Sequence, residues 1–254
     1  MKKISVTACL LLLATGLFGQ SGLPDLKDVQ KVVVKNYWGD QNIKGISRSK
    51  GGFKLSAVYT DTSKKQLLEE IELMQYVTLY KEKGTLYVLA RQPKGFESID
   101  LNLQIPSDLQ VVSELFKGGN IFMENLDKGV EINSLNGSVK LKGIAGYALV
   151  SAANGEVDIE FDRVDPSKPI SLITLNGGVS VTLPNKISRD VRLISRKNGY
   201  VLSQFPLGSD RAIKNLNKMA YSKTPIIASA TINGGGSLLF LSTQNGPLAI
   251  KKLN

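Results

Sequence analysis

The chain repeats one short phrase four times, as Asn136-Gly-Ser-Val139, Asn154-Gly-Glu-Val157, Asn176-Gly-Gly-Val179 and Asn198-Gly-Tyr-Val201. Successive Asn residues in these copies are 18, 22 and 22 positions apart. Related pairs flank the series, at Gly118-Gly119 upstream and at Asn233-Gly234 and Asn245-Gly246 downstream. A fixed period of about 20 residues is typical of stacked structural repeats. We therefore expect a repeat protein over most of the C-terminal two-thirds of the chain.

Apolar residues alternate with polar or small residues on both sides of each Asn-Gly pair. The fourth residue before the Asn is Ile132, Val150, Leu172, Ile194 or Leu241, and the second is Ser134, Ala152, Thr174, Arg196 or Thr243. The third and fifth residues after it are Val139 and Leu141, Val157 and Ile159, Val179 and Val181, or Leu248 and Ile250. Alternation with a period of two is typical of half-buried strands. The Asn shares the parity of the inward residues, which predicts that its side chain faces the interior.

Two interpretations explain the Asn-Gly pairs. Asn-Gly between alternating runs is a strong hairpin signal, because a type I′ turn needs positive φ at both central residues. Alternatively, each pair is a corner of a coil, and the Asn side chains stack about 4.8 Å apart and hydrogen-bond along the stack. Regular recurrence favours the second interpretation. The predicted fold class is all-β: a single-stranded, β-helix-like β-solenoid with a strand-rich N-terminal capping segment and one short helix.

Three segments are expected along the chain. Residues 1–19 have the basic start, apolar centre and small-residue end of a secretory signal peptide. Residues 20–96 are expected to form the capping segment, and residues 97–254 the repeat region. The expected strands are 31–38, 43–47, 53–59, 73–80, 85–89 and 99–105, with a helix over 63–71. Residues 205–225 are expected to form an excursion with a helical turn at 211–218.

Composition excludes several classes of enzyme. The chain has no His, and its one Cys is Cys9, inside the expected signal peptide. A Ser-His-Asp or Cys-His nucleophile and a His- or Cys-ligated zinc site are therefore excluded. We expect no cofactor. Cys9 lies before most of the apolar stretch, whereas a lipidated Cys normally follows it, so removal of the signal peptide is favoured over lipidation.

The net charge of +10 is concentrated in the C-terminal third of the chain. Residues 185–254 contain 11 Lys or Arg residues and two Asp residues, a difference of +9. A candidate anion-binding set lies there, consisting of Lys186, Arg189, Arg192, Arg196 and Lys197. Such a patch would suit lipopolysaccharide or acidic glycans. The alternative is a solvated face. Aromatic residues do not interleave with the basic set as they do in single-strand nucleic-acid grooves, so no nucleic-acid partner is expected.

Two further candidates carry chemistry in principle. Glu156, Asp158 and Glu160, followed by Asp162, alternate along one predicted strand and share one face. Crowded carboxylates could bind Ca²⁺ or supply the acid and base of a glycosidase, although the solvated face of an amphipathic strand is favoured. Tyr37-Trp38 could stack on a sugar, but we expect it to pack under the capping segment.

Several phrases resemble the bacterial "putative adhesin" families of exported β-strand repeats of unknown function, including those with a head Gly-Ile-Asn domain. The phrases are Ile99-Asp-Leu-Asn-Leu-Gln-Ile-Pro106, the repeated Asn-Gly-x-Val, Val179-Ser-Val-Thr-Leu-Pro184, Thr231-Ile-Asn-Gly-Gly-Gly236 and Thr243-Gln-Asn-Gly246. The resemblance spans about residues 30–252 and implies a β-solenoid, export and a surface role. The family defines no catalytic or ligand residues. Arg196 replaces the Thr that the family favours before Asn-Gly, and residues 205–225 interrupt the series.

Three functions follow as hypotheses. The favoured one is a non-enzymatic adhesion or surface-binding module of the cell envelope, with a cell-surface glycan, an envelope polymer or another protein as its partner. The second is a structural envelope protein that assembles through solenoid ends, and the third is a carbohydrate-active enzyme. No stretch of the sequence reaches about 18 consecutive apolar residues, so no transmembrane span is expected. The expected location is the periplasm, the cell surface or the medium.

Overall fold

The structure is a computed structural model that describes residues 24–50, 52–60, 76–91, 98–209 and 225–253. The expected signal peptide, the helix over 63–71 and the helical turn at 211–218 lie outside these residues. Within them the chain is all-β, and it forms two mixed sheets and one 3₁₀ turn, η1 (Arg48–Lys50). All-β architecture is thus confirmed for the described chain.

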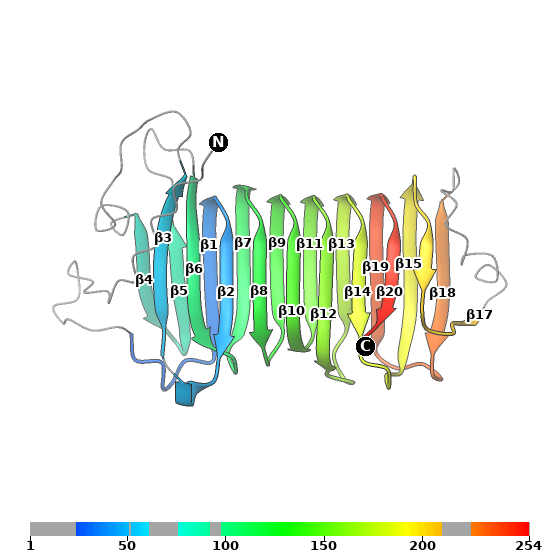
Figure 1. The fold of residues 1–254 in the computed structure, drawn as a ribbon, viewed down its shortest axis with the longest axis horizontal. Coiled ribbons are helices and arrows are strands. Elements are labelled where there is room, and N and C mark those ends of the chain that lie inside the picture. Colours follow the sequence, from blue (N-terminus) through cyan, green and yellow to red (C-terminus); the bar gives the residue numbers. More distant parts are fainter. Residues whose placement is uncertain (1–23, 51, 61–75, 92–97, 210–224, 254) are drawn as a thin grey trace.

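The strands of each sheet stand side by side along the longest axis of the molecule (Figure 1). Among the described residues, sheet A has 11 strands, in the spatial order β17 (Gly208–Ser209), β18 (Ile226–Ile232), β15 (Arg189–Lys197), β19 (Leu238–Asn245), β13 (Ile170–Asn176), β11 (Ala148–Asn154), β9 (Val130–Asn136), β7 (Gln110–Gly118), β1 (Lys31–Trp38), β5 (Thr85–Ala90), β4 (Val77–Glu82). Sheet B, counted over the same residues, has nine: β16 (Val201–Ser203), β20 (Leu248–Lys252), β14 (Val179–Leu183), β12 (Val157–Val164), β10 (Val139–Gly146), β8 (Ile121–Leu126), β2 (Gln41–Ile46), β6 (Ser98–Pro106), β3 (Lys54–Thr60).

From β7 to β14 the chain passes from sheet A to sheet B and back, so that one strand of each sheet forms a layer. Successive layers pair in parallel. Strand β11 pairs with β9, with Val150 beside Ile132 and Asn154 beside Asn136, and β12 pairs with β10. The strands before and after Asn136, Asn154 and Asn176 therefore lie in different sheets. The hairpin interpretation is wrong for these pairs.

The layers are not stacked in chain order, which corrects the expected simple series. The β1–β2 layer lies between the β5–β6 and β7–β8 layers, and the β19–β20 layer lies between β13–β14 and β15–β16. In Figure 1, blue β1 and β2 stand among green strands, and red β19 and β20 stand among yellow ones. The first and last layers of the described chain are thus each hydrogen-bonded on both sides rather than left at an edge of the stack.

Antiparallel strands lie at both ends of the stack. At one end β3 pairs with β6 and β4 pairs with β5, and at the other β18 pairs with β15 and β17 pairs with β18. Residues 20–96 are expected from the sequence to cap the stack. Much of this segment is instead part of the stack, because β1, β2 and β5 form parallel pairs inside the sheets. The expected strands over 31–38, 53–59, 85–89 and 99–105 match β1, β3, β5 and β6 closely.

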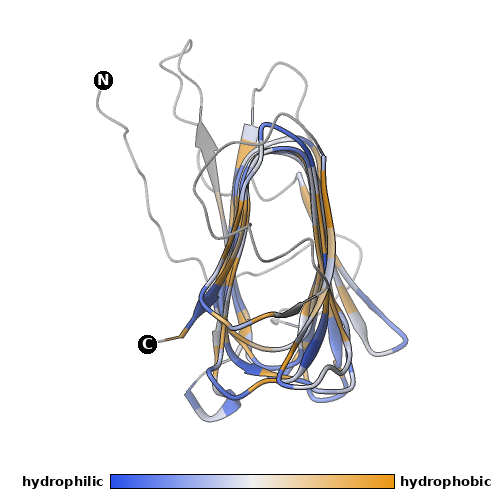
Figure 2. Cartoon of the chain, turned by 90° about the vertical axis from the view of Figure 1, so that its right-hand side faces the viewer, coloured by the Kyte–Doolittle hydropathy of each residue, from blue (hydrophilic) through white to orange (hydrophobic). Residues whose placement is uncertain are grey.

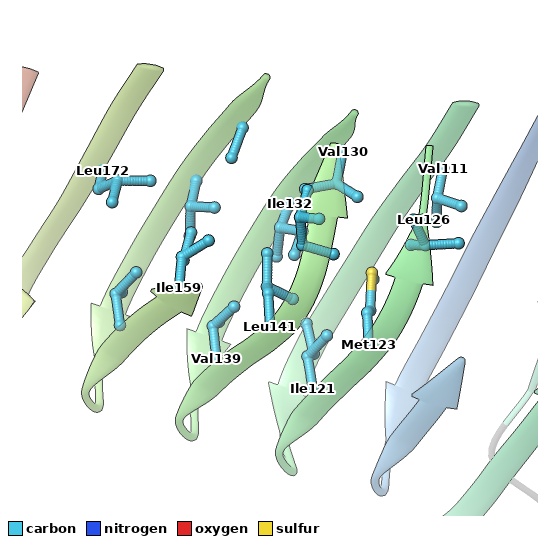
Figure 3. Packing of buried hydrophobic residues seen from close by; sticks show 14 of the residues in the cluster. Val111, Ile121, Met123, Leu126, Val130, Ile132, Val139, Leu141, Ile159 and Leu172 are labelled. Atoms are coloured by element: carbon cyan, nitrogen blue, oxygen red, sulfur yellow. The ribbon is translucent and has the colours of Figure 1, made fainter. Parts of the chain in front are cut away.

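The core lies between the two sheets. Seen along the stack, the strands form two walls with apolar segments in both (Figure 2). Inward side chains such as Val139, Leu141, Ile132 and Leu172 point into the space between the walls (Figure 3), and each is at most 2% exposed. One apolar cluster runs through the described chain from Leu26 to Ile250. The predicted alternation is confirmed for the copies at Asn136, Asn154, Asn176 and Asn245.

The corners between the sheets bring backbone against backbone. Gly119, Gly137, Gly155, Gly177 and Gly246 have φ values between +118° and +150°. A Cβ at Gly155 would lie 2.2 Å from the carbonyl oxygen of Gly137, and one at Gly177 would lie 2.1 Å from that of Gly155. Each corner therefore requires its glycine for two reasons, the positive φ and the close approach of the neighbouring layer.

Gly155→Ala should lower the free energy of unfolding by about 2–5 kcal/mol, because the new methyl group meets the Gly137 carbonyl and φ is unfavourable for alanine. The matched control is Gly52→Ala, where an added Cβ has no atom within 4 Å. The control should change the free energy by no more than about 0.5 kcal/mol. Urea denaturation followed by circular dichroism measures both, and equal midpoints for the two variants would contradict the corner geometry.

Candidate functional site

The Asn-Gly corners join four Asn side chains in one hydrogen-bonded column. Nδ2 of Asn154 donates to Oδ1 of Asn136, Nδ2 of Asn176 to Oδ1 of Asn154, and Nδ2 of Asn245 to Oδ1 of Asn176, each at 2.7 Å. Asn154 and Asn176 are exposed, and the other two are half-buried. The expectation that these side chains face the interior is wrong, because the chain turns at the Asn and the side chain lies along the outside of the corner.

Hydroxyl groups form a second column inside the same corner. Thr174 Oγ1 donates to the Gly155 carbonyl at 3.1 Å, and Thr243 Oγ1 donates to that of Gly177 at 2.8 Å. These residues are the second before each Asn. They satisfy the carbonyl groups that the close approach of the layers brings together. The hydroxyl of Ser134, at the equivalent place, has no hydrogen-bond partner.

A third column of hydrogen bonds, from side chains to backbone amides, links the corners beyond the Asn136 end of the Asn column. Asp40 Oδ1 accepts from the backbone amide of Asn120 at 2.7 Å, and Asn120 Oδ1 accepts from that of Ser138 at 3.0 Å. Asp40, Asn120 and Ser138 each follow a corner glycine. The corners of the β1–β2 and β7–β8 layers are therefore also linked by side chains, although they lack the repeated Asn.

Asn198-Gly199 connects sheet A to sheet B, but it lies outside the Asn column. Lys197, not Asn198, pairs with Asn245 in the register of β15 and β19. The buried residues of β15 are accordingly Arg189, Val191, Leu193 and Ser195, and the expected inward positions of Ile194 and Arg196 are wrong by one residue. Asn198 has a φ of 51° and adds one residue to this corner.

Asn233-Gly234 is not a corner between the sheets. It begins the connection from β18 to β19, and both of these strands lie in sheet A. Asn233 has a φ of 47°, and its Nδ2 donates to the carbonyl oxygen of Ile187 at 2.7 Å. This copy of the motif therefore supports a turn at one end of the stack.

The structure does not bring the predicted basic set together. Lys186 is exposed in the loop after β14, Arg192 and Arg196 are exposed on the outer face of β15, and Lys197 lies at the corner. Arg189 is only 1% exposed. Its Nη1 donates to the Lys168 carbonyl and its Nη2 to the Asp165 carbonyl, both at 2.7 Å. Arg189 therefore joins the β12–β13 loop to β15, and its proposed anion-binding role is wrong.

Burial lowers the pKa of the Arg189 guanidinium, and the charge of Asp165 opposes this shift. The pKa of the Asp165 carboxyl is lowered by a hydrogen bond from the Ser167 hydroxyl and by another from the Ser167 backbone amide. Elsewhere, burial and a hydrogen bond to Glu131 raise the pKa of Tyr147 to about 12. All three effects belong to contacts that hold loops or strand ends in place.

The predicted carboxylates lie on the outer side of sheet B. Asp158 and Glu160 on β12 are half-buried, and Glu156 before that strand is exposed. Asp158 pairs in register with Lys140 on β10. Within the described residues, no group of three or more His, Cys, Asp or Glu side chains is arranged to hold a metal ion. The geometry therefore adds no support to the calcium candidate.

Tyr37 and Trp38 lie at the end of β1. Tyr37 is 46% exposed, whereas Trp38 is half-buried and has the Lys117 ammonium 3.6 Å from its ring centroid. This cation–π contact links the corner of the β1–β2 layer to that of the β7–β8 layer. Trp38 thus has a structural contact, and Tyr37 is the exposed member of the pair.

Sheet A carries an apolar row on its outer face, next to the Asn column. Phe116, Leu135 and Leu175 are each about half exposed and lie on β7, β9 and β13, with Ala153 between them on β11. They line a shallow groove of about 600 Å³. Exposed rows of this kind mark surfaces that contact other molecules.

Sheet B carries a larger groove, of about 820 Å³, on its outer face between β3 and β10. Its outward side chains are mostly basic or amide: Lys44, Lys54, Lys140, Lys142, Asn42, Asn102, Gln104, Ser56, Glu124 and Phe122. The Phe122 side chain is 39% exposed. The groove combines positive charge, hydrogen-bonding groups and one aromatic ring on one open face of the sheet.

Sequence reasoning missed this groove, because its residues come from five strands between positions 42 and 142. Alternation does predict that Lys140 and Lys142 share a face, as do Asn42 and Lys44. It cannot predict that β2 lies beside β6 and β8. None of the helical segments in the described chain is long and apolar enough to span a membrane.

Asn154→Ala should lower the free energy of unfolding by about 0.5–1.5 kcal/mol, because it removes two side-chain hydrogen bonds that water can partly replace at this exposed corner. Asn133→Ala is the matched control, since Asn133 is exposed on the outer face of β9. Thermal unfolding by calorimetry compares the two. A melting temperature no lower for Asn154→Ala than for Asn133→Ala would contradict a stabilising column.

Arg189→Met should destabilise the fold by about 2–4 kcal/mol, because it removes the guanidinium hydrogen bonds to the Asp165 and Lys168 carbonyl groups. Arg192→Met removes the same charge from an exposed position on the same strand and should change stability by no more than about 0.5 kcal/mol. Chemical denaturation measures both variants. Equal stabilities would show that the buried guanidinium is not needed.

The sequence matches no protein-family model and no curated protein. Solved structures are similar. A "putative cell adhesion protein" from Clostridium sporogenes has a TM-score of 0.50 at 11% identity, over 91% of this chain and 96% of its own. A "putative adhesin" from Bacteroides fragilis has a TM-score of 0.42 at 10% identity, over 89% of this chain and 93% of its own. Another from Parabacteroides merdae has a TM-score of 0.32 at 8% identity, over 89% of this chain and 92% of its own. The chain is thus similar in fold to the Clostridium protein.

Proposed function

We propose that this chain is an exported, non-enzymatic β-solenoid that acts as an adhesion or surface-binding module. The layers that alternate between the sheets, and the Gly and Asn columns at their corners, support the solenoid. In this proposal the Asn-Gly pairs are structural and bind no ligand. Residues 1–19 direct export, residues 20–96 build one end of the stack, and residues 97–254 build the rest.

The observation that carries the proposal is the groove on the outer face of sheet B. Five strands hold its side chains at fixed spacings, since neighbouring strands lie about 4.8 Å apart. The groove is open and shallow, which suits an extended polymer better than a small substrate that must be enclosed. Polar and charged groups from separate strands can contact successive units of such a polymer. The proposal extends to this chain the role that the name "putative cell adhesion protein" gives to the Clostridium sporogenes protein.

Export agrees with the composition of the chain. A basic start and an apolar stretch at residues 1–19 are typical of a secretory signal. The described core extends through all the layers, so a protein without disulfides can be stable by apolar burial and ladder hydrogen bonds. The proposed location is the periplasm, the cell surface or the medium, and the proposed partner is a polymer or protein at a cell surface.

Binding of the purified protein to an array of envelope polysaccharides, peptidoglycan fragments and surface glycans tests this function. We expect saturable binding to at least one polymer, with no release of reducing ends during long incubation. Asp158→Asn together with Glu160→Gln serves as a control for the enzyme hypothesis. Absence of saturable binding across the array would overturn the adhesion role, and glycan cleavage that this double variant abolishes would replace it with a hydrolase.

A further inference from the structure

We propose that the groove on the outer face of sheet B binds an anionic polysaccharide, such as a uronate-containing or sulfated glycan chain. This inference rests on the proposed adhesion function and specifies the ligand class and the face that binds it. It is argued from the charge of the groove, from the order of its outward side chains across the five strands, and from its single aromatic ring.

The groove has an excess of positive charge. Four Lys side chains line it, and Glu124 is its one acidic lining residue. Lys44 pairs with Glu124 at 2.6 Å. Lys54, Lys140 and Lys142 form no ion pair with any described residue, and all three are exposed. Three ammonium groups on one face are thus available to carboxylate or sulfate groups of a ligand.

The strand register places the charges in a row across the sheet. Following the paired positions from β3 to β10, the row is Lys54, Gln104, Lys44, Glu124 and Lys142. A Lys occurs on every second strand, so successive ammonium groups start about 10 Å apart. This spacing is close to the length of a disaccharide unit in an extended glycan. A polymer with one acidic group per disaccharide would therefore match the row, with its middle acidic group replacing Glu124 as the partner of Lys44.

A second row distinguishes a glycan from other polyanions. From β3 to β10 it contains Ser56, Asn102, Asn42, Phe122 and Lys140. Asn42 Nδ2 donates to Asn102 Oδ1 at 2.9 Å, which leaves the other oxygen and amide nitrogen free to contact sugar hydroxyls. The exposed ring of Phe122 offers an apolar surface between Asn42 and Lys140. Amides beside a ring suit the polar edge and the apolar face of a pyranose.

The neighbouring strand limits the site. Asp158 on β12 lies beside Lys140, and Glu160 follows on the same outer face. These carboxylates repel an anionic chain that continues past β10. The site therefore extends over the five strands from β3 to β10, about 19 Å between the first and the last. We expect it to accommodate a short oligosaccharide stretch of a longer polymer.

Titration of the purified protein with polygalacturonate and with chondroitin sulfate, with neutral dextran as the uncharged comparison, tests the inference. We expect both acidic glycans to bind, dextran to bind at least about tenfold more weakly, and the affinity to fall as salt rises. Lys140→Gln with Lys142→Gln should weaken binding by about tenfold and reduce the salt dependence.

Arg192→Gln with Arg196→Gln is the matched control, because it removes the same charge from the exposed outer face of sheet A. This control should change affinity by less than about twofold. Phe122→Ala should weaken binding to both glycans by about fivefold without changing the salt dependence. Unfolding curves that superimpose on that of the wild type confirm that each variant is folded.

Four outcomes would overturn the inference. They are an equal effect of the two charge variants, no effect of Phe122→Ala, tighter binding of dextran than of the acidic glycans, or tighter binding of polyglutamate, oligothymidylate or phosphatidylglycerol vesicles. If the wild-type protein binds polymers of the surface array but groove variants bind them equally well, the adhesion function stands and the groove assignment fails. If the wild type binds no polymer in either experiment, both proposals fail.

Discussion

The close approach of backbone to backbone at the corners is the constraint on which the stack depends. The carbonyl oxygen of one corner glycine occupies the place where a Cβ of the next layer would lie, from Gly39 to Gly246. These layers can therefore pair in parallel at the normal strand spacing only if the corner residue is glycine. The Thr hydroxyls inside the corner then satisfy glycine carbonyl groups, and the Asn side chains outside it hydrogen-bond to one another from layer to layer.

The fixed geometry of the corners also determines which side chains lie on the outer faces of the two sheets. Once the glycines are in register, the residues of a layer take the faces that their parity gives them, except at the bulges in β7 and β10, and the same row runs across several strands. The Lys and amide rows of sheet B and the apolar row of sheet A arise in this way. Function is thus expected in surfaces made of many layers, and a residue such as Phe122 acquires its neighbours from strands distant in sequence.

Local patterns predicted the interior well, because burial on a strand depends on parity alone. Val139, Leu141, Leu172 and Leu241 are buried as the alternation requires. The order of the layers could not be predicted, since the β19–β20 layer would satisfy its alternation equally well at the end of the stack. The shift at Lys197 depends on one extra residue in a corner, which a shared Asn-Gly phrase conceals. The outward Asn side chains follow from the turn itself, where strand parity no longer applies.

The most direct test is the distance between spin labels at Asn133 on β9 and Ser229 on β18, both exposed on the outer face of sheet A. With the C-terminal layer inserted, five strand spacings and an offset of two residues along the strands separate these positions, and pulsed electron resonance should give a narrow distribution centred at about 25 Å. A narrow distance of about 20 Å would mean that the layers stack in chain order, and a broad distribution would mean that the corners do not align. Either result would contradict the account.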